Sequence, residues 1–130
     1  MIEFILAFLC TLVAFLAVLW TGLRWRIKRR RALHLSLVGL TVALLVWTIA
    51  AALQLGKGYD LETAGAIYPV HMLLAKLATL SLLAPVATGV VTLRTGESHR
   101  HHRTGAFSAF VLIVLSAITG IWMILVASPI

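Results

Sequence analysis

The sequence predicts an all-α membrane protein: a four-helix, up-and-down transmembrane bundle with both termini on the non-cytoplasmic side. Apolar residues make up 62% of the 130 residues and charged residues only 12%. The mean hydropathy of +1.05 lies far above that of soluble globular domains. Four apolar segments can each supply the roughly 20 residues that a helix needs to cross a bilayer. These segments are continuously apolar, whereas a transmembrane β-barrel would alternate polar and apolar residues.

The four helices are expected over residues 2–22, 33–56, 64–94 and 104–128, as one domain with short loops. The first segment, MIEFILAFLC, lacks the basic start of a signal peptide and carries Glu3 instead, so we interpret it as a retained helix. Pro85 should kink the third helix and free a carbonyl, because proline cannot donate a backbone hydrogen bond. We identify no internal repeat.

The net charge of +7 is concentrated in two loops, RWRIKRRR and residues 94–103. Short basic loops stay in the cytoplasm, so the loop over residues 56–68 should face outward. This pattern predicts a multi-pass protein of the bacterial cytoplasmic membrane. Neither basic loop is long enough for a nucleic-acid-binding domain, and contact with anionic lipid fits the RWRIKRRR segment better. The single cysteine, Cys10, excludes an intrachain disulfide.

Small and weakly polar residues follow one side of each helix when the chain is plotted at 100° per residue. Such residues mark helix–helix interfaces in membranes because they let two backbones approach closely. The four stripes are Glu3, Ala7, Cys10, Thr11, Ala14 and Ala17; His34, Thr41 and Thr48; His71, Ala75, Ala78, Leu82, Pro85 and Gly89; and His102, Gly105, Ala109, Ile113, Ser116 and Gly120. Three histidines are therefore predicted to lie on packing faces.

His34 and His102 each open a helix at the cytoplasmic edge. Two inward imidazoles at one depth can serve as axial ligands of a b-type haem. Arginines beside them could pair with the haem propionates; these are Arg30, Arg31 and Arg103. In the alternative, both imidazoles are interfacial and donate hydrogen bonds to loop carbonyls. The neighbouring His99 and His101 are expected to be solvated.

His71 is expected near the outer surface, at the depth of Glu3 and Met123. Carboxylate, imidazole and thioether together could hold copper or iron, and a structural hydrogen bond between Glu3 and His71 is the alternative. Lys76 points about 140° away from the His71 stripe. A lysine inside the membrane is costly, so it either extends to the headgroups or meets another membrane subunit at an interface.

Three segments, ALHLSLVGL, IYPVHMLLAKLA and HRTGAFSAFVLIVLSAITGIWMIL, resemble a small four-helix bacterial membrane family. That family, long without an assigned function, includes the cytochrome oxidase assembly factor CtaM. The similarity covers about residues 30–127 and includes His34, His71, and His102 followed by Thr119 and Gly120. Histidines at the mouths of helices also give a weaker likeness to cytochrome b561-type haem proteins.

Two functions are in contention. The resemblance implies an accessory or assembly subunit of a respiratory or other redox membrane complex, and Lys76 favours the same function. The alternative is a b-type cytochrome that carries one haem between His34 and His102 and transfers electrons. The sequence shows neither a nucleophile beside a base nor a glycine loop for phosphate, so we expect no enzyme activity beyond electron transfer. Its cofactor candidates are this haem and a copper or iron ion at Glu3, His71 and Met123.

Overall fold

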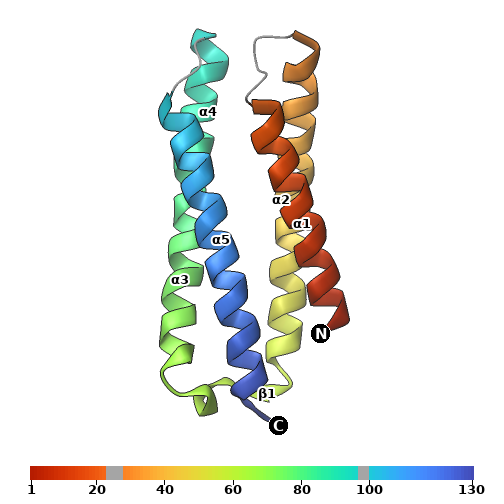
Figure 1. Ribbon diagram of the computed structural model, residues 1–130, viewed down its shortest axis with the longest axis vertical. Coiled ribbons are helices and arrows are strands. Elements are labelled where there is room, and N and C mark those ends of the chain that lie inside the picture. Colours follow the sequence, from red (N-terminus) through yellow and green to blue (C-terminus); the bar gives the residue numbers. More distant parts are fainter. Residues whose placement is uncertain (23–27, 97–99) are drawn as a thin grey trace. The chain divides into compact units, whose positions relative to one another are not determined.

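The computed structural model describes residues 1–22, 28–96 and 100–130, with residues 28–30 described by their backbone alone. It forms two compact units, Met1–Gly58 and Tyr59–Ile130, each built on antiparallel helices (Figure 1). The first unit holds α1 (Ile2–Gly22) and α2 (Lys28–Gly56). The second holds β1 (Tyr59–Asp60), the 3-10 helix η1 (Leu61–Ala64), α3 (Ile67–Ser81), α4 (Leu83–Thr95), α5 (Arg100–Val126) and β2 (Ser128–Pro129).

Four helical segments are long and apolar enough to cross a membrane, as predicted: Ile2–Thr21, Arg31–Gly56, Ile67–Thr95 and Arg100–Val126. The shortest has 20 residues, which at about 1.5 Å per residue extends about 30 Å. That length matches the hydrocarbon core of a typical bilayer. The third segment comprises α3 and α4 together.

In the first unit, α1 and α2 pack through small and hydroxyl-bearing residues. The hydroxyl oxygens of Thr11 and Thr48 lie 2.8 Å apart across the interface. Both threonines are buried, and each hydroxyl also lies within hydrogen-bonding distance of a carbonyl of its own helix, that of Ala7 or Leu44. Since each hydroxyl has one hydrogen, one threonine donates across the interface and the other accepts. The indole of Trp47, on α2, donates to the carboxylate of Glu3, near the start of α1, over 3.4 Å.

In the second unit, the third span is interrupted between Ser81 and Leu83. Pro85 has no N–H to donate to the carbonyl of Ser81, so the regular helical bonding fails there. The N–H of Leu82 instead donates to the carbonyl of Thr79, three residues back, over 3.3 Å. The interruption is confined to Leu82, which keeps right-handed helical dihedrals, φ of −66° and ψ of −22°, between α3 and α4.

The ends of the second unit are also fixed by local bonds. Gly96 ends α4 with φ of 73° and donates its N–H to the carbonyl of Thr92 over 2.9 Å, a left-handed cap that favours glycine. At the other end, Tyr59 pairs with Pro129 in a two-stranded antiparallel ladder. The N–H of Ser128 donates to the hydroxyl of Thr63 over 2.8 Å, which ties the end of α5 to η1.

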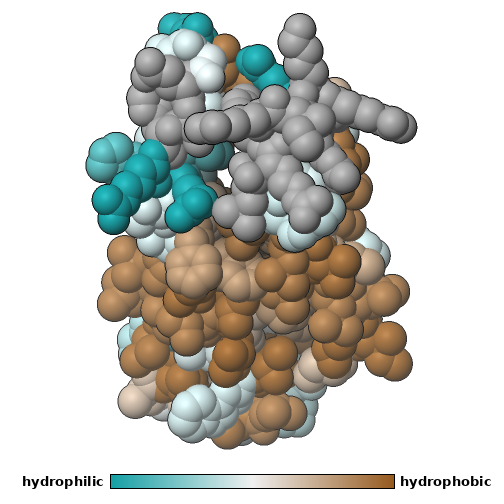
Figure 2. Space-filling model, turned by 45° about the horizontal axis from the view of Figure 1, so that its top comes forward, coloured by the Kyte–Doolittle hydropathy of each residue, from teal (hydrophilic) through white to brown (hydrophobic). Residues whose placement is uncertain are grey.

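Alanine and threonine make up most of the buried residues, and many large apolar residues lie outside. Leu53, Leu73 and Leu125 are among many exposed large apolar side chains, and Figure 2 shows brown apolar residues over much of the visible surface. Every member of the four predicted stripes is buried or half-buried except Glu3. The predicted packing faces are thus confirmed, and the exposed leucines are suited to contact lipid.

Three of the four helix starts differ from the prediction. α2 begins at Lys28 and α5 at Arg100, because the basic segments before each span continue the helix outward. α3 begins at Ile67, later than residue 64, since η1 and Gly65 intervene. Gly65 adopts φ of 63°, a left-handed conformation that interrupts a helix.

Candidate functional site

The imidazole of His34, near the start of α2, is buried against α1. Its Nδ1 lies 3.1 Å from the carbonyl oxygen of Val18 and 3.1 Å from the hydroxyl of Thr21. A carbonyl oxygen can only accept, so Nδ1 must carry the hydrogen. The Thr21 hydroxyl donates to carbonyls of its own helix, which leaves its oxygen to accept from the imidazole.

The imidazole of His102, on the first turn of α5, has the same arrangement against α4. Its Nδ1 lies 2.9 Å from the carbonyl oxygen of Pro85 and 3.2 Å from the hydroxyl of Thr88. Thr88 donates to the carbonyl of Ala84 over 2.7 Å. The next residue is Gly89, where an added Cβ would lie 3.2 Å from Cε1 of His102. The ring therefore packs directly on the backbone of α4.

His71, on the first turn of α3, repeats the arrangement against the end of α5. Its Nδ1 lies 3.1 Å from the carbonyl oxygen of Ser116 and 3.2 Å from the hydroxyl of Thr119. Thr119 donates to the carbonyl of Leu115 over 3.0 Å. An added Cβ at Gly120 would lie 2.9 Å from Cε1 of His71, closer than real side chains allow.

The three sites share one chemical consequence. In each, Nδ1–H donates to a carbonyl and to the hydroxyl of a threonine three residues later, and a glycine follows that threonine. A neutral imidazole held in this way carries its lone pair on Nε2. Metal-binding histidines typically have their second nitrogen anchored by a carbonyl or carboxylate, which fixes the ring and raises its basicity. We call these three the tethered histidines.

Thr21 and Thr88 did not emerge from the sequence analysis, and Thr119 entered it only through the resemblance, although a signal for Thr88 and Thr119 exists. His71 precedes Thr88–Gly89 by 17 positions, and His102 precedes Thr119–Gly120 by the same interval. Since the third and fourth spans run antiparallel, each histidine meets the threonine of the other span. The resemblance paired His102 with Thr119 along one helix, but the structure pairs Thr119 with His71.

The first hairpin does not show the same 17-residue spacing. The positions that lie 17 residues from Thr21 and from His34 hold Phe4 and Ala51. Both are buried, at 8% and 7% exposure. The first hairpin therefore has one tether, between His34 and Thr21, and apolar residues at the positions where this spacing would place a second.

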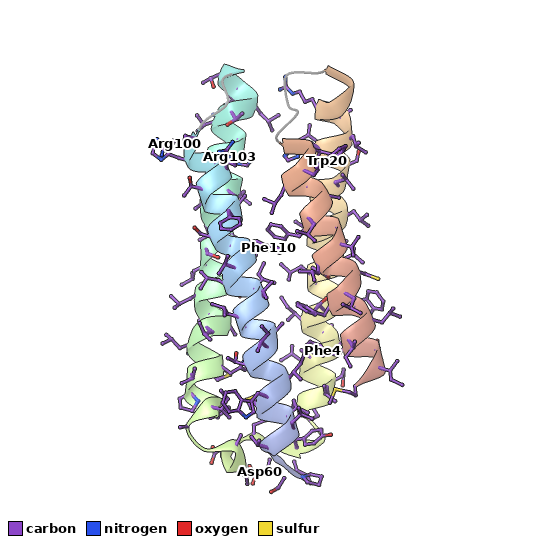
Figure 3. The ribbon with its side chains drawn as sticks, in the orientation of Figure 1. Phe4, Trp20, Asp60, Arg100, Arg103 and Phe110 are labelled. Carbon is purple, nitrogen blue, oxygen red and sulfur yellow. The ribbon has the colours of Figure 1, made fainter. Side chains whose placement is uncertain are left out.

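The carbonyls that accept from Nδ1 of His34 and His102, those of Val18 and Pro85, belong to helices α1 and α4, whereas loop carbonyls were the expected acceptors. His101 is exposed, as expected. His99 and the side chain of Arg30 lie outside the described residues. Arg31 is half-buried and Arg103 exposed. Figure 3 shows Arg100 and Arg103 near the start of α5, at the end of the second unit opposite Asp60.

The proposed Glu3–His71–Met123 set joins residues of both units and stays a prediction. Within its own unit, Glu3 accepts a hydrogen bond from Trp47, whereas Met123 is buried on α5, in the same unit as His71. Across residues 1–22, 28–96 and 100–130, no group of three or more His, Cys, Asp or Glu side chains is placed to hold a metal ion. This search does not bear on haem, because the protein holds a haem iron with fewer than three side-chain ligands.

Lys76 is exposed on α3, nine residues after the start of that span. Among the residues that the structure describes, no hydrogen bond or ion pair to its ammonium is found. Its neighbours along the exposed side, Leu73 and Leu80, are apolar. The side chain thus presents a cation on a surface that is otherwise suited to lipid.

Comparison with protein-family models, with curated proteins and with solved structures gives no match. The tethered histidines and Lys76 are therefore the features of the chain from which its function is inferred.

Proposed function

We propose that the chain is a small b-type cytochrome that transfers electrons in the membrane, with His34 and His102 as the axial ligands of one haem. The tether on Nδ1 of both imidazoles is the observation that supports this function best. The pairing of these two residues comes from the sequence, because each lies just after a strongly basic loop and so at the same predicted depth. A bound haem would supply one-electron transfer.

The tether suits axial ligation for a physical reason. Donation of Nδ1–H to the carbonyl of Val18 or Pro85 raises the basicity of Nε2 and prevents the ring from turning. Ordinary packing of a histidine between helices does not require the same nitrogen to be anchored each time. Arg103, exposed beside His102, is placed to pair with a propionate.

The first experiment is a dithionite-reduced minus oxidised spectrum of the purified protein, with haem per chain measured alongside. We expect b-type Soret and α bands, which His102→Ala should abolish or strongly reduce. His101→Ala is the matched control, since His101 is an exposed neighbour on the same turn, and its spectrum should be unchanged. A wild-type protein without these bands, or a His102→Ala variant with normal haem content, would contradict the proposal.

The second candidate is an accessory or assembly subunit of a respiratory or other redox complex, as the resemblance to the CtaM-containing family implies. Exposed Lys76 favours it, because an ammonium inside a span is costly unless it reaches the headgroups or an acidic group of a partner. Native electrophoresis after mild-detergent extraction should show the chain in a much larger assembly. Lys76→Met should release it, whereas Lys57→Met, a change of the same type in a loop, should not. A wild-type chain that migrates alone would exclude this function.

We also propose that the basic end of the second unit faces the cytoplasm of a bacterial cell. Arg94, Arg100 and Arg103 are exposed at that end, whereas Asp60 and Glu62 are exposed at the other. Positive loop residues are retained on the cytoplasmic side. This orientation places His102 near the inner surface and His71 near the outer one.

A further inference from the structure

Two arginines open an exposed row of side chains on α5. Arg100 and Arg103 lie on the first turn of this helix and are exposed, and Figure 3 shows both near its start. Because they are three residues apart, they lie on the same side of the helix. His102, between them, points away from that side and is held against α4 by Thr88. The arginines are therefore separate from the candidate haem ligand.

The two guanidinium groups give this end of the second unit an excess of positive charge. No hydrogen bond or ion pair of either guanidinium is found among the residues that the structure describes. The described carboxylates of this unit, Asp60 and Glu62, lie at its opposite end, in β1 and η1. Glu97 lies outside the described residues and can neutralise only one of the three arginines between residues 94 and 103. The first unit adds one carboxylate, that of Glu3.

Apolar side chains continue the row along the same side of α5. Phe107, Val111 and Leu115 follow Arg103 at intervals of four residues and are 59%, 38% and 43% exposed. Residues four apart are neighbours on the surface of a helix. The row from Arg103 to Leu115 extends about 18 Å, which is close to one leaflet, half of a hydrocarbon core about 30 Å thick. The row thus has a cationic end and an apolar length that matches an acyl chain.

We infer that this row binds one anionic phospholipid, with its phosphodiester at Arg100 and Arg103 and an acyl chain along the apolar side chains. A guanidinium pairs with a phosphate through two parallel N–H···O bonds. The apolar row selects a lipid over a soluble phosphate, because only a lipid carries hydrocarbon next to its anion. A phospholipid lies along the surface of a helix, so the site requires no enclosed cavity.

Lipid binding by the full chain in mild detergent tests the inference. The protein is titrated with phosphatidylglycerol or with phosphatidylcholine of the same acyl chains, and native mass spectrometry counts the lipids bound. The wild type should retain more phosphatidylglycerol than phosphatidylcholine. Each arginine near the headgroups contributes about five-fold in affinity for anionic lipid. Arg100→Gln combined with Arg103→Gln should therefore bind phosphatidylglycerol about 25-fold more weakly at this site and retain about one lipid fewer per chain.

Three controls separate the site from other causes of lipid binding. Arg100→Lys combined with Arg103→Lys keeps both positive charges and should retain the lipid. Arg94→Gln removes an arginine about 180° around α4 from Pro85, which contacts His102, and should also retain it. Glycerophosphoglycerol, the headgroup without acyl chains, should not displace the lipid. The basic residues Lys28–Arg31 at the start of α2 supply cations of their own, so each variant is compared with the wild type.

Several results would overturn the inference. One is a wild type that retains the two lipids equally, and another is a glutamine double variant that retains as much phosphatidylglycerol as the wild type. Displacement of the lipid by glycerophosphoglycerol would show a site for a soluble anion instead. Haem per chain, measured on the same samples, addresses the propionate role of Arg103. An Arg103→Gln variant that keeps its lipid but loses haem would assign this arginine to the haem and not to the lipid.

Discussion

Replacement of Gly120 by alanine tests whether His71 is held against α5 as the structure describes. The new Cβ would lie 2.9 Å from Cε1 of His71, whereas carbon atoms in contact rest about 3.5–4.0 Å apart. The ring must then retreat by about 0.6–1.1 Å. Its Nδ1 bonds to Ser116 and Thr119, at 3.1 and 3.2 Å, would stretch beyond the range of hydrogen bonding.

The energetic result follows from two opposing effects. A half-buried imidazole N–H that loses its acceptors costs about 1–3 kcal/mol. Alanine is better than glycine inside a helix by about 0.5–1 kcal/mol. Gly120→Ala should therefore lower the free energy of unfolding by about 0.5–2 kcal/mol. Gly39→Ala, where an added Cβ meets nothing within 4 Å, should raise it by about 0.5–1 kcal/mol.

The assay is equilibrium unfolding in mixed micelles with increasing sodium dodecyl sulfate, followed by far-ultraviolet circular dichroism. Gly89→Ala provides an intermediate case, because its Cβ would lie 3.2 Å from His102 and the ring has less far to move. Stability should fall in the order Gly39→Ala, Gly89→Ala, Gly120→Ala. If Gly120→Ala proved as stable as Gly39→Ala, the packing of His71 on α5 described above would be refuted.

Three further predictions concern the hairpins. A double-mutant cycle with Thr11→Val and Thr48→Val, in the same unfolding assay, should give a coupling of about 0.5–1.5 kcal/mol; additivity would show that their 2.8 Å contact adds no stability. Thr88→Val should cost about 1 kcal/mol because His102 loses an acceptor, and Thr79→Val, at an exposed hydroxyl bonded only to its own helix, should cost less. A cysteine at Lys57, in a chain without its native cysteine, should react with impermeant maleimide on intact cells; protection there would reverse the proposed orientation.

The class of the fold and the direction of its packing faces could be predicted from the sequence. A run of about 20 apolar residues must form a helix in a bilayer, since each backbone polar group has to be satisfied within the segment. Helical periodicity then places small residues on one side, and for this reason Ala7, Ala78 and Ala109 were correctly expected inside. The inward position of His34 followed from the same periodicity.

Only the tertiary structure decided what each histidine touches. The tethers join residues 13, 14 and 48 positions apart, and the partners depend on how far one helix slides along its neighbour. A slide of one residue, about 1.5 Å, would carry Thr119 out of hydrogen-bonding distance of His71. Hydropathy does not fix that slide, because Leu, Ile and Val on the outer faces are equally soluble in lipid at any register. The register is set by side chains that meet across the interface, here threonine, glycine and imidazole.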